Sequence, residues 1–597
     1  MDSRLLRAIG PATLVTVAVV VMVASLAYGG GAAPLVIADA GPVVRWGLPT
    51  TTLIFNLAAA GLLGSLILAL FALKAGDRAF DVALDVASVS AAVFTVAAGV
   101  TGFFTFIDAF NAQVTLGPEF GAQFGKFLTD TELGRAWLLT TVFGALLTVL
   151  TFAVRSWTGT FLVAILAIAA LVPVGTQGHS GEEANHNAAV MATVLHIEGA
   201  ALWLGGLLLL IVIRPLLPAE RMTTVLRRYS TIAIVAFVVV AASGYVRGVI
   251  GVVTWDAMLS PYGAILALKI VALVAMGLLG AWYRLRLIDR MRESRASRFF
   301  WWLILAEIGF MGLASGAAVA LARTPPPVDT SLPELRTPAE FLTGAALPPE
   351  LTPWQWVAAW EIDLLWALLC AFAAFFYLAG VWRLRARGDR WPLYRTVLFL
   401  SGLVMLAWIT NGAHNVYQEY LFSVHMFGHM ALTMGIPLLL VAGAPVTLAL
   451  RAVRKRDDGT RGGREWILWA IHTPFAKVVT NPFFAAGNFV LSLWLFYYTD
   501  LFRWSLYDHL GHEWMIFHFL ITGYLFVLSL IGIDPVPYRL PYPFRLLILI
   551  GVMAMHAFFG IAIMMNSGLM VAEWFGAMGR TWGATPLEDQ YIGGGIA

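Results

Sequence analysis

The sequence predicts an all-α protein, a polytopic bundle of about 15 transmembrane helices arranged as nine plus six. Of its 597 residues, 60% are hydrophobic and 12% are charged, whereas soluble proteins carry roughly 25% charged residues. The mean hydropathy is +0.80, and apolar runs of about 20 residues, the length that crosses a bilayer, recur along the chain. This composition excludes a water-soluble enzyme, and the net charge of +3 is too small to indicate a nucleic-acid partner.

Nine apolar runs precede a Pro-rich connection and six follow it. The first run has Arg4 and Arg7 before it and Ser25-Leu26-Ala27 after it, a pattern typical of a signal peptide. We expect it to remain as an anchor, because about 17 consecutive apolar residues suffice to stay in a bilayer. Pro437 and Pro445 should kink or end the unusually long twelfth run. The predicted spans lie near 10–28, 48–73, 82–108, 133–154, 158–175, 187–213, 227–253, 261–283, 299–322, 356–382, 391–412, 420–450, 482–500, 510–532 and 543–566.

The basic residues predict the orientation of these spans. With the N-terminus in the cytoplasm, the cytoplasmic segments collect 29 of the 38 Lys and Arg residues, as the excess of positive charge on cytoplasmic loops requires. We therefore expect a multi-pass protein of the cell (plasma) membrane with a cytoplasmic N-terminus.

The longest outer connection divides the chain. Residues 324–353 contain eight prolines and no apolar run long enough to span, which is typical of an extended linker. The sequence thus predicts one domain over 1–323 and a second over 354–597.

Cysteine usage limits the chemistry. Cys370 is the only cysteine, so an internal disulfide and a CxxC metal site are excluded, and its apolar surroundings predict a buried side chain. Neither a GxxxxGK[ST] phosphate loop nor an HExxH motif occurs. Soft-metal chemistry must therefore use the 11 His and 19 Met residues.

The histidines fall on one side of the predicted membrane. A histidine inside a span is expensive and indicates function. His472 alone is placed on the cytoplasmic side, whereas the other ten lie at the outer face or in the outer half of their helices. These ten are His179, His186, His414, His509 and His512 at outer loops or helix ends, and His196, His425, His429, His518 and His556 within helices.

Three helices of the second domain present an imidazole at a similar depth. At 1.5 Å per residue, His429, His518 and His556 lie about 12, 13 and 15 Å below the outer ends of their predicted helices. Met426 and Met430 form a stripe beside the His425/His429 pair. Imidazole with thioether and without thiolate favours copper over zinc, and thioether favours Cu(I). The predicted ligands are His425, His429, His512, His518 and His556, with Met426, Met430 and His509 as further candidates.

Two other interpretations of these residues stay open. The histidines could form hydrogen bonds between helices while the methionines pack. One histidine of the pair could instead be an axial haem ligand, although two histidines four residues apart on one helix do not clamp one porphyrin.

The first domain offers a sparser set. The outer loop before the sixth span contains His179, Glu182, Glu183 and His186, and His196 follows three turns down the next helix. This loop could collect a cation above His196 as a relay, or it could be a solvated polar loop. Glu198 with Arg247 or Lys269 is a candidate neutralising pair within the membrane.

Several motifs resemble known families. The segment His425–Pro445 (HMFGHMALTMGIPLLLVAGAP), residues 509–534 and the His556 helix resemble the membrane-integral CtaG family of cytochrome c oxidase assembly factors. His196–Gly206 and the helices up to about residue 322 resemble the CopD/YcnJ-type copper-transport family. The order of the two is similar to a fusion found in actinobacterial membrane proteins. CtaG-like chains continue beyond a segment like 589–595 into a further helix, whereas this chain stops at Ala597. The resemblance leaves two alternatives, a terminal span missing from this sequence or a protein without one.

The resemblance implies a carrier rather than an enzyme. The first part would acquire or transport copper, and the second would supply it to the CuB centre in subunit I of a haem–copper cytochrome c oxidase. An extracytoplasmic copper chaperone would be a further partner, besides the lipid bilayer. The alternatives are a b-type haem electron-transfer protein and a metal-free accessory subunit of the oxidase.

Overall fold

The computed structural model describes residues 3–35, 39–115, 117–176, 186–252, 255–287, 294–327 and 336–597. Every regular element within these ranges is a helix, so the all-α expectation is confirmed. His179 of the predicted entry loop lies outside the described residues, and His186 begins a helix whose first side chain is not described.

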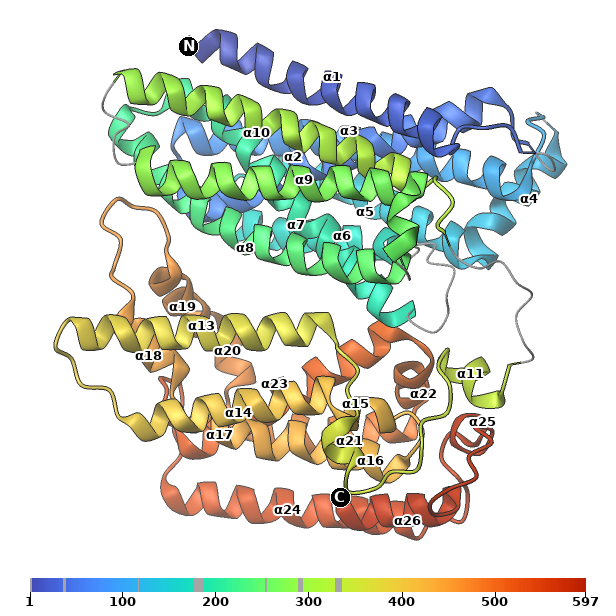
Figure 1. Ribbon diagram of the computed structural model, residues 1–597. Coiled ribbons are helices and arrows are strands. Elements are labelled where there is room, and N and C mark those ends of the chain that lie inside the picture. Colours follow the sequence, from blue (N-terminus) through green and yellow to red (C-terminus); the bar gives the residue numbers. More distant parts are fainter. Residues whose placement is uncertain are drawn as a thin grey trace. The chain divides into compact units, whose positions relative to one another are not determined.

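The helices divide into two compact units, which we describe separately. The first unit contains α1 to α10. Its longer helices run nearly alongside one another (Figure 1), and α1 packs on α10, α2 on α3, α3 on α5, and α9 on α10. The helices are α1 (Ser3–Gly29), α2 (Pro42–Ala72), α3 (Arg78–Phe110), α4 (Pro118–Asp130), α5 (Glu132–Ala153), α6 (Trp157–Gly175), α7 (His186–Ile213), η2 (Arg214–Leu216), α8 (Ala219–Gly251), η3 (Trp255–Leu259), α9 (Pro261–Trp282), η4 (Tyr283–Leu287) and α10 (Ser294–Leu321).

The second unit contains α11 to α26. Contacts of α14 with α17, of α17 and α21 with α23, and of α26 with α16 and α24 hold it together. Its helices are α11 (Pro338–Thr343), α12 (Gln355–Ala358), α13 (Leu364–Ala386), α14 (Leu393–Asn411), α15 (Ala413–Tyr417), α16 (Phe422–Met430), η6 (Ala431–Gly435), α17 (Ile436–Ala442), α18 (Pro445–Ala452), α19 (Gly463–His472), α20 (Pro474–Val479), α21 (Pro482–Tyr498), α22 (Asp500–Tyr507), α23 (His509–Ile531), α24 (Tyr542–Met564), α25 (Ala572–Phe575) and α26 (Pro586–Ile596).

Fourteen helices in the described ranges are long and apolar enough to cross a membrane, nine in the first unit and five in the second. The predicted span at 482–500 corresponds to α21, which has 17 residues and falls just below that length. A helix of that length rises about 26 Å, slightly less than the roughly 30 Å hydrocarbon core. The chain is therefore a multi-pass membrane protein with one span fewer than we expected by this criterion.

The described part of the predicted linker contains one short helix. Thr337 caps α11 through a capping box, in which its hydroxyl accepts from the Glu340 N–H and the Glu340 carboxylate accepts from the Thr337 N–H. These hydrogen bonds satisfy backbone donors that a short helix otherwise leaves exposed. They also lower the pKa of the Glu340 carboxyl, because they favour its charged form.

The long run at 420–450 is interrupted twice, as its prolines predict. A π-helical segment, η6, separates α16 from α17. Pro437 lies at the start of α17 and has no N–H to give to the carbonyl four residues earlier. Before Pro445, Ala444 adopts a left-handed conformation with φ 50° and precedes α18 as its N-cap. Single π turns inside helices often occur at functional sites, and this one begins at Ala431, two residues after His429.

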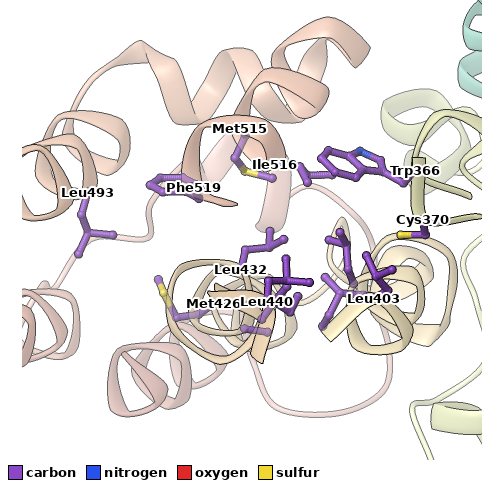
Figure 2. Packing of buried hydrophobic residues seen from close by; sticks show 14 of the residues in the cluster. Trp366, Cys370, Leu403, Met426, Leu432, Leu440, Leu493, Met515, Ile516 and Phe519 are labelled. Atoms are coloured by element: carbon purple, nitrogen blue, oxygen red, sulfur yellow. The ribbon is translucent and has the colours of Figure 1, made fainter. Parts of the chain in front are cut away.

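The core of the second unit is apolar and tightly filled (Figure 2). Side chains of α13, α14, α16, α17, α21 and α23 meet there, including Trp366, Leu403, Met426 and Phe519. Cys370 belongs to the same cluster and is 7% exposed, which confirms the expected burial.

Helix α23 crosses the π segment at a glycine. A Cβ atom on Gly523 would overlap the carbonyl of Thr433. Because Pro437 leaves that carbonyl without its usual partner, close approach of α23 shields it from lipid. The crossing fixes α23, with its histidines, against α16.

We expect Gly523→Ala to destabilise the protein by about 1–3 kcal/mol, because the added methyl forces the two backbones apart. Gly551→Ala is the matched control. That glycine also lies inside a helix of the second unit, but a Cβ there meets no atom within 4 Å, so alanine's better helix propensity should leave stability unchanged or slightly higher. Thermal unfolding of the purified variants in detergent measures both, and equal melting temperatures for the two would contradict the proposed crossing.

Candidate metal centre

Helix α16 carries two buried histidines one turn apart. His425 and His429 are 3% and 4% exposed. The ring of His425 lies 5.0 Å from that of Phe502, and its Nε2 atom has no hydrogen-bond partner among the described residues. Buried polar atoms are normally paired, so this nitrogen is unusual.

His429 is enclosed by aromatic rings. Its imidazole centroid is 4.0 Å from the Phe519 ring and 5.6 Å from the Tyr497 ring. Neither ring nitrogen of His429 has a hydrogen-bond partner in the described part of the chain, nor does the buried hydroxyl of Tyr497. Three polar atoms at one place therefore lack the partners that burial demands.

A second helix brings an imidazole to a sulfur atom. His556 on α24 is 2% exposed, and its Nε2 lies 3.1 Å from the Sδ of Met430 on α16. The Nδ1 atom of His556 has no partner in the described ranges. Nitrogen and thioether sulfur side by side form a pair of soft-metal donors.

His429 interacts electrostatically with three other histidines of the second unit. His429 interacts with His556, His425 and His518. His518 on α23 is half-buried and stacks on Trp514 with ring centroids 4.9 Å apart. In the structure, His429 and His518 lie seven and nine residues after the first residues of α16 and α23, and His556 lies eight residues before the last residue of α24, or about 10–14 Å at 1.5 Å per residue.

An outer group adjoins the inner one through His425. His425 interacts electrostatically with His414 and His512, and the Nε2 of His512 lies 3.2 Å from the amide nitrogen of Gln418. We therefore name two groups, an inner one of His429, His518, His556 and Met430 and an outer one of His414, His509 and His512, and His425 interacts electrostatically with members of both.

His414 belongs to the outer group, although the ligands predicted from the sequence did not include it. It is 2% exposed on the short helix α15, and its Nδ1 lies 2.8 Å from the carbonyl of Ile409. Its Nε2 faces the backbone of α16, where a Cβ on Gly428 would overlap it. The sequence placed His414 among the histidines at loops or helix ends, and Gly428, between His425 and His429, was a usable signal of close approach.

Acidic and hydrogen-bonding groups lie at the start of α23. His509 Nε2 is 3.8 Å from Glu513 Oε1, and the indole N–H of Trp366 donates to Glu513 Oε2 at 2.8 Å. In the connection between α15 and α16, burial and the nearby Glu361 carboxylate raise the pKa of Glu419 to about 8. A cation that arrives near these groups would favour the ionised forms of the Glu513 and Glu419 carboxyls.

Met426 and Met430 have different surroundings. Met426 is fully buried in the apolar core (Figure 2), whereas Met430 is partly buried and its sulfur contacts His556. Of the two predicted thioethers, Met430 is therefore the better placed to share an ion with an imidazole.

In the first unit, His196 on α7 lies beside α8. Its Nδ1 is 3.1 Å from the hydroxyl of Ser243. The candidate pair of Glu198 with Arg247 or Lys269 does not form, since no ion pair joins these described side chains. Glu198 is two residues after His196, so it projects about 200° away from His196 around α7. Its carboxylate therefore does not reach Arg247 or Lys269.

Within the described ranges, no three His, Cys, Asp or Glu side chains converge as a metal-holding group. The inner group instead pairs two different donors, because His556 Nε2 lies 3.1 Å from Met430 Sδ. His429 interacts electrostatically with His556. Such a set suits a soft ion of low coordination number better than zinc or a hard cation.

Three family models match successive regions of the chain. A model described as copper resistance protein D-like, N-terminal domain, matches residues 38–188, and one described as copper resistance protein D matches 223–321. The model described as cytochrome c oxidase caa3 assembly factor (CtaG) matches 375–597. These regions follow one another in the order that the sequence motifs indicate.

Similar proteins occur in mycobacteria. Uncharacterized proteins of Mycobacterium bovis and Mycobacterium tuberculosis are each 30% identical to the chain over 480 residues, covering 78% of this chain and 68% of theirs. One of Mycobacterium leprae is 31% identical over 513 residues, covering 80% and 70%. No solved structure matches the chain. The chain belongs with these relatives to the family of multi-pass membrane proteins in which copper resistance protein D-like regions precede a CtaG-type oxidase assembly factor region.

Proposed function

We propose that this protein receives copper on the outer side of the membrane and supplies it for the CuB centre in subunit I of a haem–copper cytochrome c oxidase. One observation carries the proposal: the His556–Met430 nitrogen–sulfur contact lies beside His429, whose two buried nitrogens have no partner among the described residues. The family matches to copper resistance and oxidase assembly proteins support the same conclusion.

The unpartnered nitrogens favour a bound ion. Leaving a buried donor or acceptor unpaired costs about 1–3 kcal/mol per group. A metal ion bound by one ring nitrogen of His429, with His556 Nε2 and Met430 Sδ as further donors, would remove part of that cost. It would use neutral imidazoles, the form in which histidine binds metals. The Met430 thioether selects Cu(I) among the available ions.

The two groups of histidines define a route. Copper would meet His509 and Glu513 first, then pass by His512, His414 and His425 to the inner group of His429, His518, His556 and Met430, with Met426 as a further predicted ligand. Because His425 adjoins both groups, it is the natural transfer point. Each step exchanges one imidazole for another, so the ion need not become bare inside the membrane.

The first unit would acquire the copper. His179 and His186 are its proposed entry ligands and His196 its relay, with an extracytoplasmic copper chaperone as a proposed donor and the cell membrane, N-terminus inside, as the proposed setting. In this role the protein is a carrier that binds and releases copper without changing a substrate.

Haem fits these histidines less well than copper. A porphyrin is a broad plate that needs open space at the axial nitrogen. Phe519 and Tyr497 occupy that space beside His429, and Met430 occupies it beside His556.

Copper content tests the site. After anaerobic loading with Cu(I) and desalting, we expect the purified full chain to retain copper and the His425→Ala/His429→Ala variant to lose most of it, because that variant removes the transfer point and the central ligand. His472→Ala, which changes an exposed histidine on α19, is the matched control and should retain wild-type copper. Equal copper in wild type and the double variant, measured by mass spectrometry of the metal, would contradict the proposed ligands.

Oxidase assembly tests the destination of the copper. In cells whose only copy is His429→Ala, we expect the purified oxidase to contain less copper per haem than with wild type, because subunit I receives less metal for CuB. Excess copper in the medium should restore the ratio by mass action.

Elemental analysis of the oxidase with its visible spectrum gives that ratio, and cells with His472→Ala are again the control. A normal copper-to-haem ratio in the His429→Ala cells would instead support a metal-free accessory role.

A further inference from the structure

Three helices of the first unit bring basic side chains together in the half of the unit that contains the start of α7. The side chains are His196 on α7, Arg247 on α8 and Lys269 on α9. None of the predicted copper functions requires Arg247 or Lys269, and two cations inside membrane spans need an explanation, because such residues are costly and indicate function.

The register between α8 and α9 sets the position of Lys269. Tyr262 packs against Gly251, and Leu266 packs against Gly248, 3.7 Å from where its Cβ would be. Tyr262, Leu266 and Lys269 follow one stripe of α9 at spacings of four and three residues, so Lys269 lies one turn further on, at the level of Gly244.

Helix α7 meets α8 at the same level. The ring of His196 lies over Gly244, 3.4 Å from where a Cβ would be, and its Nδ1 contacts the Ser243 hydroxyl at 3.1 Å. Arg247 is one turn along α8 from Ser243. Electrostatic interactions agree with this placement, since His196 interacts with both Lys269 and Arg247, and these interact with each other.

No acidic side chain neutralises the two cations within the described part of the chain. Other bases of the first unit are paired, such as Arg323 with Asp108 at 2.6 Å. The buried Glu307 is held by the indole N–H of Trp203 at 3.2 Å and the hydroxyl of Tyr283 at 3.5 Å.

We propose that Arg247 and Lys269 bind an oxyanion, a phosphate group, between α8 and α9. Guanidinium and ammonium are the side chains that bind phosphate through charge-assisted hydrogen bonds. The Tyr262 hydroxyl packs against Gly251, one turn along α8 from Arg247, and adds a neutral donor at the edge of this site. The phosphate can be a lipid headgroup, reached by the long basic side chains, or free inorganic phosphate.

The bound anion has a consequence for His196. A copper ion at this histidine would otherwise lie beside two positive charges, which repel it across a medium of low dielectric constant. An anion on Arg247 and Lys269 cancels this repulsion. The anion site itself rests on the first unit alone and does not require copper to bind anywhere.

Two probes test the site on the full chain. Equilibrium dialysis measures binding of radiolabelled inorganic phosphate to delipidated protein in detergent, and native mass spectrometry measures retention of phosphatidylglycerol against phosphatidylcholine. We expect the wild type to bind at least one probe and Arg247→Gln/Lys269→Gln to bind it more weakly by about tenfold or more, the loss expected for a charge-assisted hydrogen bond. Binding of the lipid alone or of free phosphate alone identifies the source of the phosphate group.

Matched variants separate charge from structure. Arg135→Gln changes an exposed base of the same unit, on α5, and should bind as the wild type does. Lys269→Arg keeps the charge and should retain binding, and if the double variant does not fold, Lys269→Gln against Lys269→Arg makes the same comparison. Binding of both probes by the charge-neutral variant as tightly as by the wild type, or by neither protein, would overturn the proposal. Copper retained by the second unit should be the same in all these variants, so this outcome is independent of the copper proposal.

Discussion

A buried imidazole nitrogen without a hydrogen-bond partner costs free energy, and the second unit contains several. His425, His429 and His556 are all less than 5% exposed, and each has at least one unpaired ring nitrogen among the described residues. Inside a membrane water cannot repay this cost. The proposed copper site depends on this constraint, because a soft metal ion is the ligand that would satisfy neutral nitrogens and the neighbouring Met430 sulfur together.

The backbone around α16 holds these side chains in place. The π segment and Pro437 interrupt the α-helical hydrogen bonds of this helix from Ala431 on, two residues after His429. The Gly523 crossing brings α23 against this turn. On the other side, Gly428 lets His414 reach the backbone of α16. Close contacts at Gly428 and Gly523, together with the break inside the α16–α17 helix, therefore bring histidines of α15, α16, α23 and α24 near one another. The polar backbone groups at the break remain shielded from lipid.

Much of the fold could be predicted from apolar runs, because hydropathy and length decide which segments cross a bilayer. The breaks at Pro437 and Ala444 followed from Pro437 and Pro445, and the burial of Cys370 followed from its apolar neighbours. The pairing of side chains could not be predicted in the same way. His414 looked like a loop residue, the His556–Met430 contact joins residues 126 positions apart, and Glu198 did not meet the bases proposed for it, because contacts between helices depend on rotations that a single sequence does not specify.

X-ray absorption of the Cu(I)-loaded full chain directly identifies the atoms that bind copper at the inner site. We expect scattering from imidazole nitrogens together with one sulfur, and loss of the sulfur contribution in Met430→Leu, a substitution that conserves volume. Met515→Leu, which changes a buried methionine of the apolar core, should keep the sulfur signal. Copper bound without imidazole, or a sulfur signal that is unchanged in Met430→Leu, would contradict the assignment of His429, His556 and Met430 as the inner site.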